Sequence, residues 1–568
     1  MVRTSRVSDD SNFSKSIGVL MKLTGDIGRD QIRRLEGLSP FELEGYLNQI
    51  ASKQERGSAA AMLNAGRGNP NFVATTPREA FFRLGLFALE ECRRAYEWDS
   101  EMAHSPALEG AGARFRRWLE AHDGESGVDL LRRTLDYGVC ELSFDEDEFT
   151  WELVDSIIGD HYPTPPRMLE YNEAITRRYL VREMGVQAAG RDDHYDVFAT
   201  EGGAAAMTYL FNTLKANWLL SRGDRVAMMT PIFTPYLETA GLPDFAFDNV
   251  HIDASARTES GLQTWQFPDT EIDKLRDPTV KLLFCVNPSN PPSVRIADAT
   301  LDRIAKIVAT DKRDLMIVTD DVYATFIDGF RSLMAVLPRN TATVYSFSKF
   351  FGATGWRLGA IAVHSENVFD RLLGRLPEEA LTELDARYKG LTLEPRKLKF
   401  IDRLLADSRN VALAHAAGLS LPQQCQQLLF CAYCLLDGDD HYKRVAQRIV
   451  NDRLKTLLDG MQVTIPDDPN RVGYYIELDF LDWGERKFGK GFAAFLQERY
   501  EPEDLLFRLA EKTSVVLLPG LGFAGPPWSV RVALANLTDT DYERIGRGMM
   551  QIAEEYVAEW KKARTAAS

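Results

Sequence analysis

Short apolar runs alternate with helical patterns of hydrophobic and polar positions over residues 160–360. Lys281–Val286 and Leu315–Val318 are two of the apolar runs, and each leads into polar residues. Runs of this length, separated by helix patterns, are typical of parallel strands that helices cover on both faces. The pattern therefore predicts an α/β fold with a mostly parallel sheet.

The pattern changes outside this region, so we expect several parts along the chain. Residues 365–410 resemble a helical insertion, and long helices followed by the strands Tyr474–Leu478 and Val515–Leu518 come after it. These strands indicate a smaller α+β domain, with the substrate between the two domains. The expected parts are an N-terminal arm (1–37), the N-terminal part of the small domain with a helical insertion (38–155), the large domain (156–364), a second helical insertion (365–410) and the C-terminal small domain (411–568).

Composition narrows the class of protein without identifying it. The 568 residues are 45% hydrophobic and 26% charged, as in a globular protein of two or three domains. A net charge of −16 argues against nucleic acid or an anionic membrane as partner. No apolar run approaches the roughly 20 residues of a membrane span, and the N-terminal run is too short for a secretory signal. We therefore expect a cytoplasmic protein, with six cysteines that stay reduced and no metal site.

One segment, residues 346–359, combines a lysine with hydroxyls, glycines and an arginine. Lys349 is a candidate to bind the aldehyde of pyridoxal 5'-phosphate (PLP) as a Schiff base. Ser346, Ser348 and Arg357 supply hydrogen-bond donors and charge for its phosphate. On its own, Ser-x-Ser-Lys fits a strand end with a solvated lysine equally well.

Three segments upstream supply the other parts of such a site in a fixed order. Gly202 and Gly203 follow a strand-like run and open a helix, where backbone N–H groups face an anion. Asn290 lies in a proline-rich loop after Lys281–Val286 and can bind the phenolic oxygen of the cofactor. Asp320 ends the next strand and is the candidate partner of the pyridine nitrogen, while Tyr323 reaches the same oxygen as Asn290. Each segment alone is an ordinary turn or helix cap; the order favours a cofactor site.

With these motifs in place, the chain resembles the class I/II aminotransferases of PLP fold type I. The resemblance implies that Lys349, Asp320 and Tyr323 are catalytic. It also implies that Phe233 stacks on the cofactor ring, that Ala204 joins the phosphate site and that Arg531 binds the substrate α-carboxylate. Tyr162 resembles a tyrosine that reaches the phosphate of a second subunit, so the resemblance implies a homodimer or a larger homo-oligomer.

A narrower resemblance, from about Ser39 to the end of the chain, is to the bacterial aspartate 4-decarboxylases. It is carried by residues 39–43, 64–72 and 404–409, and by Asn-Pro-Pro-Ser at 290–293 where many aminotransferases have Asn-Pro-Thr-Gly. The resemblance places Gly66 and Arg67, both in the segment 64–72, at the substrate, and we expect Arg67 either to orient the distal substrate carboxylate or to stabilise an entry loop. Two positions depart from that family, which has lysine and threonine where this chain has Glu44 and Ala416.

The resemblance predicts a PLP-dependent carboxy-lyase that converts L-aspartate to L-alanine and carbon dioxide, with transamination of aspartate as a side reaction. Glu44 and Ala416 keep a second reading open, in which the enzyme acts on another amino acid by transamination, elimination or carbon–carbon bond formation. A third reading is a non-catalytic assembly protein with the same fold. The retention of Lys349, Asp320, Asn290 and Arg531 together argues against that third reading.

Overall fold

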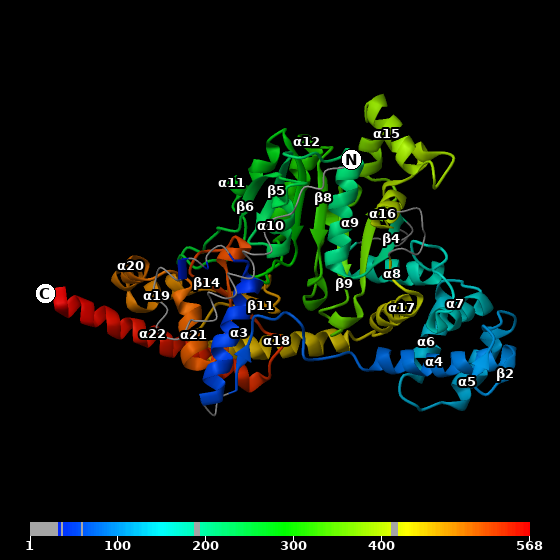
Figure 1. Ribbon diagram of the computed structural model, residues 1–568, viewed down its shortest axis with the longest axis horizontal. Helices are drawn as coiled ribbons and strands as arrows, with labels where there is room; N and C mark the ends of the chain where they lie inside the picture. The colour runs from blue at the N-terminus through cyan, green and yellow to red at the C-terminus, as the bar shows by residue number, and fades with distance from the viewer. Residues whose placement is uncertain are drawn as a thin grey trace, which may run out of the picture.

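The computed structural model describes residues 32, 33, 35, 38–57, 61–186, 194–409 and 418–567. Three hydrophobic cores organise this part of the chain: a larger core that reaches both faces of a central sheet, a compact core on one face of that sheet around residues 298–310, and a smaller core formed mostly by residues before 66 and after 453. The N-terminal blue segment and the C-terminal orange and red segments accordingly lie side by side in Figure 1. The predicted arm, residues 1–37, lies almost entirely outside the described residues.

The central sheet has seven strands in the order β4–β10–β9–β8–β7–β5–β6. Only β10 runs antiparallel to its neighbours within this sheet, so the prediction of a mostly parallel α/β sheet is confirmed. The strands are β4 (Tyr195–Thr200), β5 (Arg225–Thr230), β6 (Asp248–Asp253), β7 (Val280–Val286), β8 (Met316–Asp320), β9 (Thr341–Ser346) and β10 (Gly359–His364).

Helices cover both faces of the sheet because successive strand residues point to opposite sides. In β7, Leu283 and Cys285 pack into the core that contains α12 (Asp298–Thr310), whereas Leu282 and Phe284 pack into the core that contains α9 (Gly203–Ala216). A strand buried on both faces is apolar throughout, which is why β7 could be predicted from its sequence. Short helices complete this region: α10 (Thr234–Gly241), α11 (Asp269–Ile272) and α13 (Leu333–Val336).

A helical group extends the larger core on the side away from the smaller core (Figure 1). Its members pack on one another through aromatic and aliphatic side chains, with Phe87 stacked on Phe115 at 4.7 Å between ring centroids. The group consists of α4 (Thr76–Ala95), α5 (Ala111–Ala121), α6 (Val128–Asp136), α7 (Glu146–Ile158), α8 (Glu170–Glu183) and α17 (Leu421–Leu435), with a hairpin of β2 (Glu97–Asp99) and β3 (Met102–Ala103).

The smaller core surrounds an antiparallel sheet of order β11–β14–β13, together with a short parallel pair, β1 and β12. One long helix, α18 (His441–Gly460), joins the larger and the smaller core, since Val450 packs in the larger one and Leu457 in the smaller one. The other elements are β1 (Leu63–Asn64), β11 (Tyr475–Asp479), β12 (Val515–Val516), β13 (Leu518–Pro519), β14 (Ser529–Ala533), α3 (Pro40–Gly57), α19 (Phe480–Phe488), α20 (Lys490–Arg499), α21 (Asp504–Thr513) and α22 (Asp539–Ala567).

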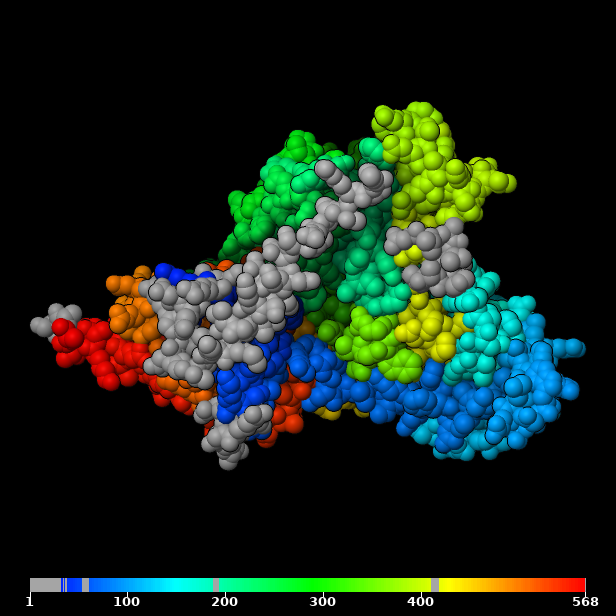
Figure 2. Space-filling view, viewed as in Figure 1, coloured from blue at the N-terminus to red at the C-terminus, as the bar shows by residue number. Residues whose placement is uncertain are grey.

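The segment predicted as a second insertion contains α14 (Val368–Leu373), α15 (Glu378–Tyr388) and α16 (Phe400–Arg409). Its yellow-green surface projects from the molecule in Figure 2. Within the segment Phe400 stacks on Phe369 at 4.4 Å between ring centroids, and Asn217 at the end of α9 donates to Asp407 at 2.9 Å, which holds the segment to the body. The division of the chain at residues 37, 155, 364 and 410 stays a prediction. Among the described residues, no helix has both the length and the apolar character needed to cross a membrane.

Candidate active site

The predicted cofactor residues follow the carboxyl ends of parallel strands. Gly202 follows β4, Phe233 follows β5, Asn290 follows β7, Asp320 ends β8 and Lys349 follows β9. Because the carboxyl ends of parallel strands lie at one edge of a sheet, the fold brings these residues together there. The N-terminal segment around Gly68 and the strands β11 and β14 of the small sheet meet the same edge.

Lys349 is half-buried at this edge, and its amine faces the N-terminal segment. Its Nζ donates a hydrogen bond of 3.0 Å to the carbonyl oxygen of Gly68. The hydroxyl of Tyr474 donates to the same oxygen at 2.8 Å. The carbonyl of Gly68 thus holds the lysine amine where a cofactor aldehyde is expected. This acceptor is neutral, so it brings no negative charge to the amine.

Asp320 is buried, with 6% of its surface exposed, and its hydrogen-bond donors in the described part of the chain are neutral. The hydroxyl of Tyr236 donates to Oδ2 at 2.6 Å, and the backbone N–H of Val322 donates to Oδ1 at 3.2 Å. Burial raises the pKa of the Asp320 carboxyl, while the hydrogen bond from Tyr236 acts against the rise. A protonated pyridine nitrogen would relieve this cost by supplying the missing positive charge.

Asn290, Tyr323 and Arg531 form a buried chain of hydrogen bonds. Arg531 Nη1 donates to Asn290 Oδ1 at 3.2 Å, and Asn290 Nδ2 donates to the Tyr323 hydroxyl at 3.5 Å. Arg531 Nη2 also donates to the carbonyl of Gly66 at 2.6 Å, and its Nε has no partner in the described structure. A buried guanidinium with a free N–H is suited to a carboxylate ligand.

The residues expected at the phosphate surround a small space at the start of α9. A Cβ at Gly202 would lie 2.6 Å from Arg357 Nη2, and one at Gly203 would lie 3.4 Å from the Ser346 Cβ. Ser346 Oγ and Ser348 Oγ are 3.0 Å apart. Arg357 adopts a left-handed conformation (φ 56°), which is uncommon for arginine, and this turns its side chain back toward Gly202. Ala204 lies in the first turn of α9.

These residues fit PLP by the chemistry of their donors. The glycine cradle, the two serine hydroxyls and Arg357 match a phosphate. Asp320, a buried acid whose donors in the described structure are neutral, matches a pyridinium. Lys349 is the amine for the aldehyde, and the Asn290 amide with the Tyr323 hydroxyl matches a phenolic oxygen. The individual roles stay predictions, but the structure brings the residues for all four chemical groups of PLP to one place.

Phe233, predicted to stack on the cofactor ring, is partly buried just before α10. Its ring makes edge contacts with Tyr236 and Phe41, with centroids 5.3 Å and 6.0 Å away. Tyr236, the donor to Asp320, stands three residues later in the same Thr-Pro-Ile-Phe-Thr-Pro-Tyr segment, but the sequence did not indicate its role.

Arg67 lies beside the site with its charge already paired. Its Nε is 3.6 Å from Glu44 Oε1, and 67% of its side chain is exposed. Glu44 is buried to 8% exposure, and its Oε1 also accepts a hydrogen bond of 2.7 Å from Asn64. Gly66 joins this pair to Arg531, because its carbonyl accepts from Arg531 while a Cβ on it would touch the Glu44 carboxyl carbon at 3.3 Å. Ala416 lies outside the described residues.

Tyr162 lies in the loop after α7 and is 65% exposed. Its predicted role across a subunit boundary stays a prediction. Near it, the ligand-type atoms of Asp155 on α7 and of Asp160 and His161 in the loop lie within 4.8 Å of one another. His161 Nδ1 is 3.1 Å from Asp155 and 3.3 Å from Asp160, so contacts of both carboxylates with the imidazole account for this group.

Sequence reasoning missed the contribution of β11. Tyr475 is buried beneath Arg531, whose guanidinium carbon lies 4.5 Å from its ring centroid, and its hydroxyl accepts from Tyr323 at 3.2 Å. Glu477, two residues on, pairs in register with Arg531, and its Oε1 accepts from Ser529 at 2.7 Å. The adjacent tyrosines at the start of a predicted strand were the signal available in the sequence.

Glu477 on β11 makes the stability of the protein depend on pH. Burial raises the pKa of its carboxyl to about 8, and the hydrogen bond from Ser529 acts against the rise. Between the ordinary glutamate pKa of 4.5 and about pH 8, the folded protein keeps a proton on this carboxyl that the unfolded chain has lost. The free energy of unfolding therefore falls as pH rises, and at pH 7 it is about 3 kcal/mol lower than below pH 4.5. Glu477→Gln should remove this loss, and its Tm should fall less than that of the natural protein from pH 6 to pH 8.5.

Glu485→Gln, at an exposed position on α19, is the matched control and should leave the pH dependence of Tm unchanged. Parallel Tm curves for Glu477→Gln and the natural protein would contradict a buried, protonated Glu477.

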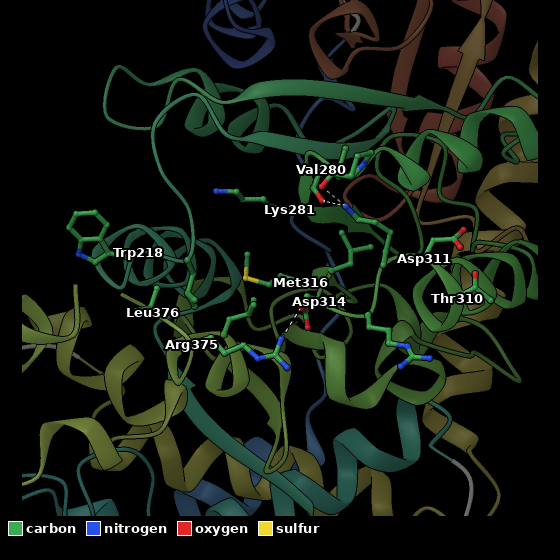
Figure 3. A pocket seen from close by; sticks show the side chains of 15 residues that line it. Trp218, Val280, Lys281, Thr310, Asp311, Asp314, Met316, Arg375 and Leu376 are labelled. Carbon is green, nitrogen blue, oxygen red and sulfur yellow. Dashed lines mark hydrogen bonds and ion pairs between the residues drawn. The ribbon is translucent and has the colours of Figure 1, made fainter. Parts of the chain in front are cut away.

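A second cavity, of about 600 Å³, lies at the opposite edge of the sheet (Figure 3). Val280 and Met316, which begin β7 and β8, line it. Arg375 pairs with Asp314 at 3.0 Å, and Lys312 donates to the carbonyl of Val280 at 2.7 Å. Because these charges are satisfied within the protein, this cavity lacks the unpaired groups of the site around Lys349.

Comparison with known proteins agrees with this geometry. Residues 160–547 match the family of class I and II aminotransferases. A bifunctional aspartate aminotransferase and L-aspartate beta-decarboxylase from Pseudomonas sp. is 47% identical over 530 residues, which are 93% of this chain and 98% of that protein. An aromatic-amino-acid aminotransferase 2 from Thermococcus litoralis is 27% identical over 46% of this chain and 63% of its own length.

Solved structures support the fold. An aspartate aminotransferase from Thermus thermophilus, a double mutant, has a TM-score of 0.54 at 17% identity and covers 92% of this chain and 98% of its own. An aromatic aminotransferase from Pyrococcus horikoshii also has a TM-score of 0.54 at 17% identity, over 89% of this chain and 99% of its own. Enzymes of the matched family use PLP and act on amino acids. This chain is an enzyme with the aspartate aminotransferase-like fold, and it belongs to the class I and II aminotransferase family.

Proposed function

We propose that the enzyme converts L-aspartate to L-alanine and carbon dioxide and also transaminates aspartate. The supporting observation is that two arginines meet at one segment: Arg531 of β14 donates to the carbonyl of Gly66, and Arg67 is the residue after Gly66. A substrate with two carboxylates matches two cations placed in this way. The 47% identity to the bifunctional Pseudomonas enzyme over 93% of the chain supports the same reaction.

PLP, when bound, supplies an electron-withdrawing ring that stabilises negative charge developing on the substrate. Arg531 holds the α-carboxylate and Arg67 orients the distal carboxylate. Lys349 removes the proton from Cα and returns it, and Asp320 keeps a proton on the ring nitrogen because its carboxylate is otherwise unpaired. When the distal carboxylate leaves as carbon dioxide, its bonding electron pair stays at Cβ and takes up one proton, which gives alanine.

The direct test is to load the purified protein with PLP and follow carbon dioxide, alanine and keto acid with aspartate and a panel of other amino acids. Aspartate should release carbon dioxide and form alanine in equal amounts, and added 2-oxoglutarate should reveal transamination. Keto acid from aspartate without carbon dioxide would leave only the aminotransferase part of the proposal.

The Glu44–Arg67 ion pair favours a second candidate function. Glu44 is held by Asn64 as well as by Arg67, so its negative charge stays at the place where a distal carboxylate would approach. An amino acid whose side chain lacks a carboxylate would avoid this repulsion. In this alternative the enzyme transaminates, eliminates from or forms a carbon–carbon bond to such an amino acid, and the same panel identifies it.

Substitutions at the ion pair separate the two candidates. With aspartate, Arg67→Ala should slow carbon dioxide release about tenfold to hundredfold, since a charge-assisted contact contributes about 1.5 to 3 kcal/mol. Glu44→Gln should lower the KM for aspartate about tenfold, because the repelling charge is removed and the loss of an ion pair with the exposed Arg67 costs little. Steady-state kinetics with aspartate checks both changes.

Glu44→Lys, which restores the residue of the narrower family, should raise carbon dioxide release further. The exposed acid Glu42 on the same helix is the matched control, and Glu42→Gln should leave the KM unchanged. If neither the natural protein nor Glu44→Lys releases carbon dioxide from aspartate, the decarboxylase proposal fails and the second candidate remains.

We also propose that the protein works as a homodimer or a larger homo-oligomer, because Tyr162 is expected to reach a partner's site. Light scattering at assay concentration should give a mass of at least twice 64.0 kDa. A fully active monomer would contradict this.

A further inference from the structure

Three buried tyrosines cluster at the site of Lys349, and only one of them, Tyr323, has been given a role in the site. Tyr323 comes from the loop after β8, while Tyr474 immediately precedes β11 and Tyr475 begins it. The ring of Tyr475 makes edge contacts with both of the others, at 5.5 Å from Tyr323 and 5.0 Å from Tyr474 between centroids. A buried phenol normally keeps its proton, so the surroundings of each hydroxyl decide whether it takes part in proton transfer.

The hydroxyl oxygen of Tyr475 ends a directed chain of hydrogen bonds. Arg531 donates to the Asn290 carbonyl, Asn290 donates to the Tyr323 hydroxyl, and Tyr323 donates to Tyr475 at 3.2 Å. The oxygen of Tyr475 is therefore an acceptor, as a phenolate requires. Tyr474 differs, since its hydroxyl donates its own proton to the carbonyl of Gly68 at 2.8 Å.

Charged groups on three elements face Tyr475. Lys349 follows β9 and Arg531 lies on β14 above the ring, whereas Asp320 at the end of β8 is the opposing negative charge. Burial works against ionisation of the phenol, but Lys349 and Arg531, with the hydrogen bond from Tyr323, hold the pKa of Tyr475 below its ordinary value. Burial raises the pKa values of the neighbouring Tyr323 and Tyr474 well above theirs.

The Lys349 amine and the Tyr475 hydroxyl oxygen both lie close to the position that a Cβ of Gly68 would occupy. A Cβ added at Gly68 would lie 2.2 Å from the Tyr475 oxygen and 3.2 Å from Lys349 Nζ. The two atoms thus border the same small space beside the Gly68 Cα, on the side where the Gly68 carbonyl holds Nζ at 3.0 Å. Proton transfer requires the two atoms to approach to about 2.6 to 3.2 Å, and the missing side chain at Gly68 leaves room for that approach.

We propose that Tyr475 is the base that activates Lys349. The phenolate oxygen takes one proton from the lysine ammonium, which leaves a neutral phenol and a neutral amine with a free electron pair. The amine would then add to the cofactor aldehyde, whose oxygen leaves as water, or accept the substrate Cα proton. Once the amine has passed the Cα proton back to the substrate, the phenol returns its own proton, and the ammonium and the phenolate form again. This inference rests on the assignment of Lys349 as the cofactor-binding lysine, but not on aspartate as the substrate.

Titration of the cofactor-free protein tests the proposal without catalysis. The ultraviolet absorbance of tyrosinate should show one phenol that ionises below about pH 10 in the natural protein and is absent in Tyr475→Phe. Tyr474→Phe, at the adjacent buried phenol, is the matched control and should keep this transition. Lys349→Met should move the same transition to higher pH, because a positive charge next to the phenolate is removed.

Kinetics of the PLP-loaded enzyme then separates proton transfer from packing. Tyr475→Phe keeps the ring under Arg531, so kcat should fall about 10²-fold or more while the KM for the amino acid changes little. Tyr475→Leu also removes the ring and should raise the KM as well. A structural role alone predicts that phenylalanine restores kcat.

Two results would overturn the proposal: equal titrations of the natural protein and Tyr475→Phe below about pH 10, or an unchanged kcat in Tyr475→Phe. Failure of the aspartate reaction would leave the titration unaffected. Failure of the Lys349 assignment would appear separately, as PLP trapped by borohydride on another residue. The aspartate reaction, the Lys349 assignment and the role of Tyr475 therefore each have a separate test.

Discussion

Lys349→Ala should abolish turnover and the attachment of PLP to the protein. The substitution removes the only amine that the described structure places among Gly68, Tyr474 and Asp320, so the group that binds the aldehyde and transfers the Cα proton is lost. Loss of such a group lowers kcat by at least about 10⁴-fold. Borohydride reduction followed by peptide mass mapping should find the cofactor on Lys349 of the natural protein and on no peptide of the variant.

The fold should survive this change, because Lys349 Nζ makes one hydrogen bond to a loop carbonyl and packs in none of the three cores. PLP should still bind weakly through the glycine cradle, Ser346, Ser348 and Arg357, and dialysis should remove it. Lys349→Arg is a control that keeps the charge but cannot form the bond to the aldehyde. An active variant with covalently trapped cofactor would show that another lysine serves.

Most of this site could be predicted because its residues stand directly after strands. A doubly buried strand such as β7 is apolar throughout, so its carboxyl end is visible in the sequence, and polar residues such as Asn290 and Asp320 stand out there. Parallel pairing of β7, β8 and β9 then brings these ends to one edge. The same apolar strands made the α/β fold with a mostly parallel sheet predictable, and that prediction was confirmed.

Tyr475 and Glu477 could not be assigned in this way. They lie on β11 of the small sheet, and their distance from Lys349 depends on how the larger and the smaller core join through α18, which no local pattern specifies. The Arg67–Glu44 pair escaped prediction for a similar reason. Both residues were noticed in the sequence, but their contact arises only because α3 packs beside the segment that carries Gly66.

Asp320→Asn should lower turnover about 10²- to 10⁴-fold and weaken PLP binding about tenfold to hundredfold. An amide cannot keep a proton on the pyridine nitrogen, so the ring withdraws electrons less strongly, and a charge-assisted hydrogen bond of about 1.5 to 3 kcal/mol is lost. The fold should tolerate the change, since burial raises the pKa of Asp320 and an uncharged group is easier to bury. Fluorescence titration with PLP and single-turnover kinetics measure the two effects separately.

Asp321 is the matched control for this prediction. It is the next residue and equally buried, but it accepts hydrogen bonds from Ser332 and from Thr319 at 2.5 Å, away from Tyr236 and the site. Burial raises the pKa of its carboxyl to about 7. Asp321→Asn should therefore alter Tm and its pH dependence while PLP affinity stays within about twofold of the natural value. If Asp321→Asn lost the cofactor and Asp320→Asn kept it, the two carboxylates would have to exchange roles, and the orientation of the ring against β8 would be reversed.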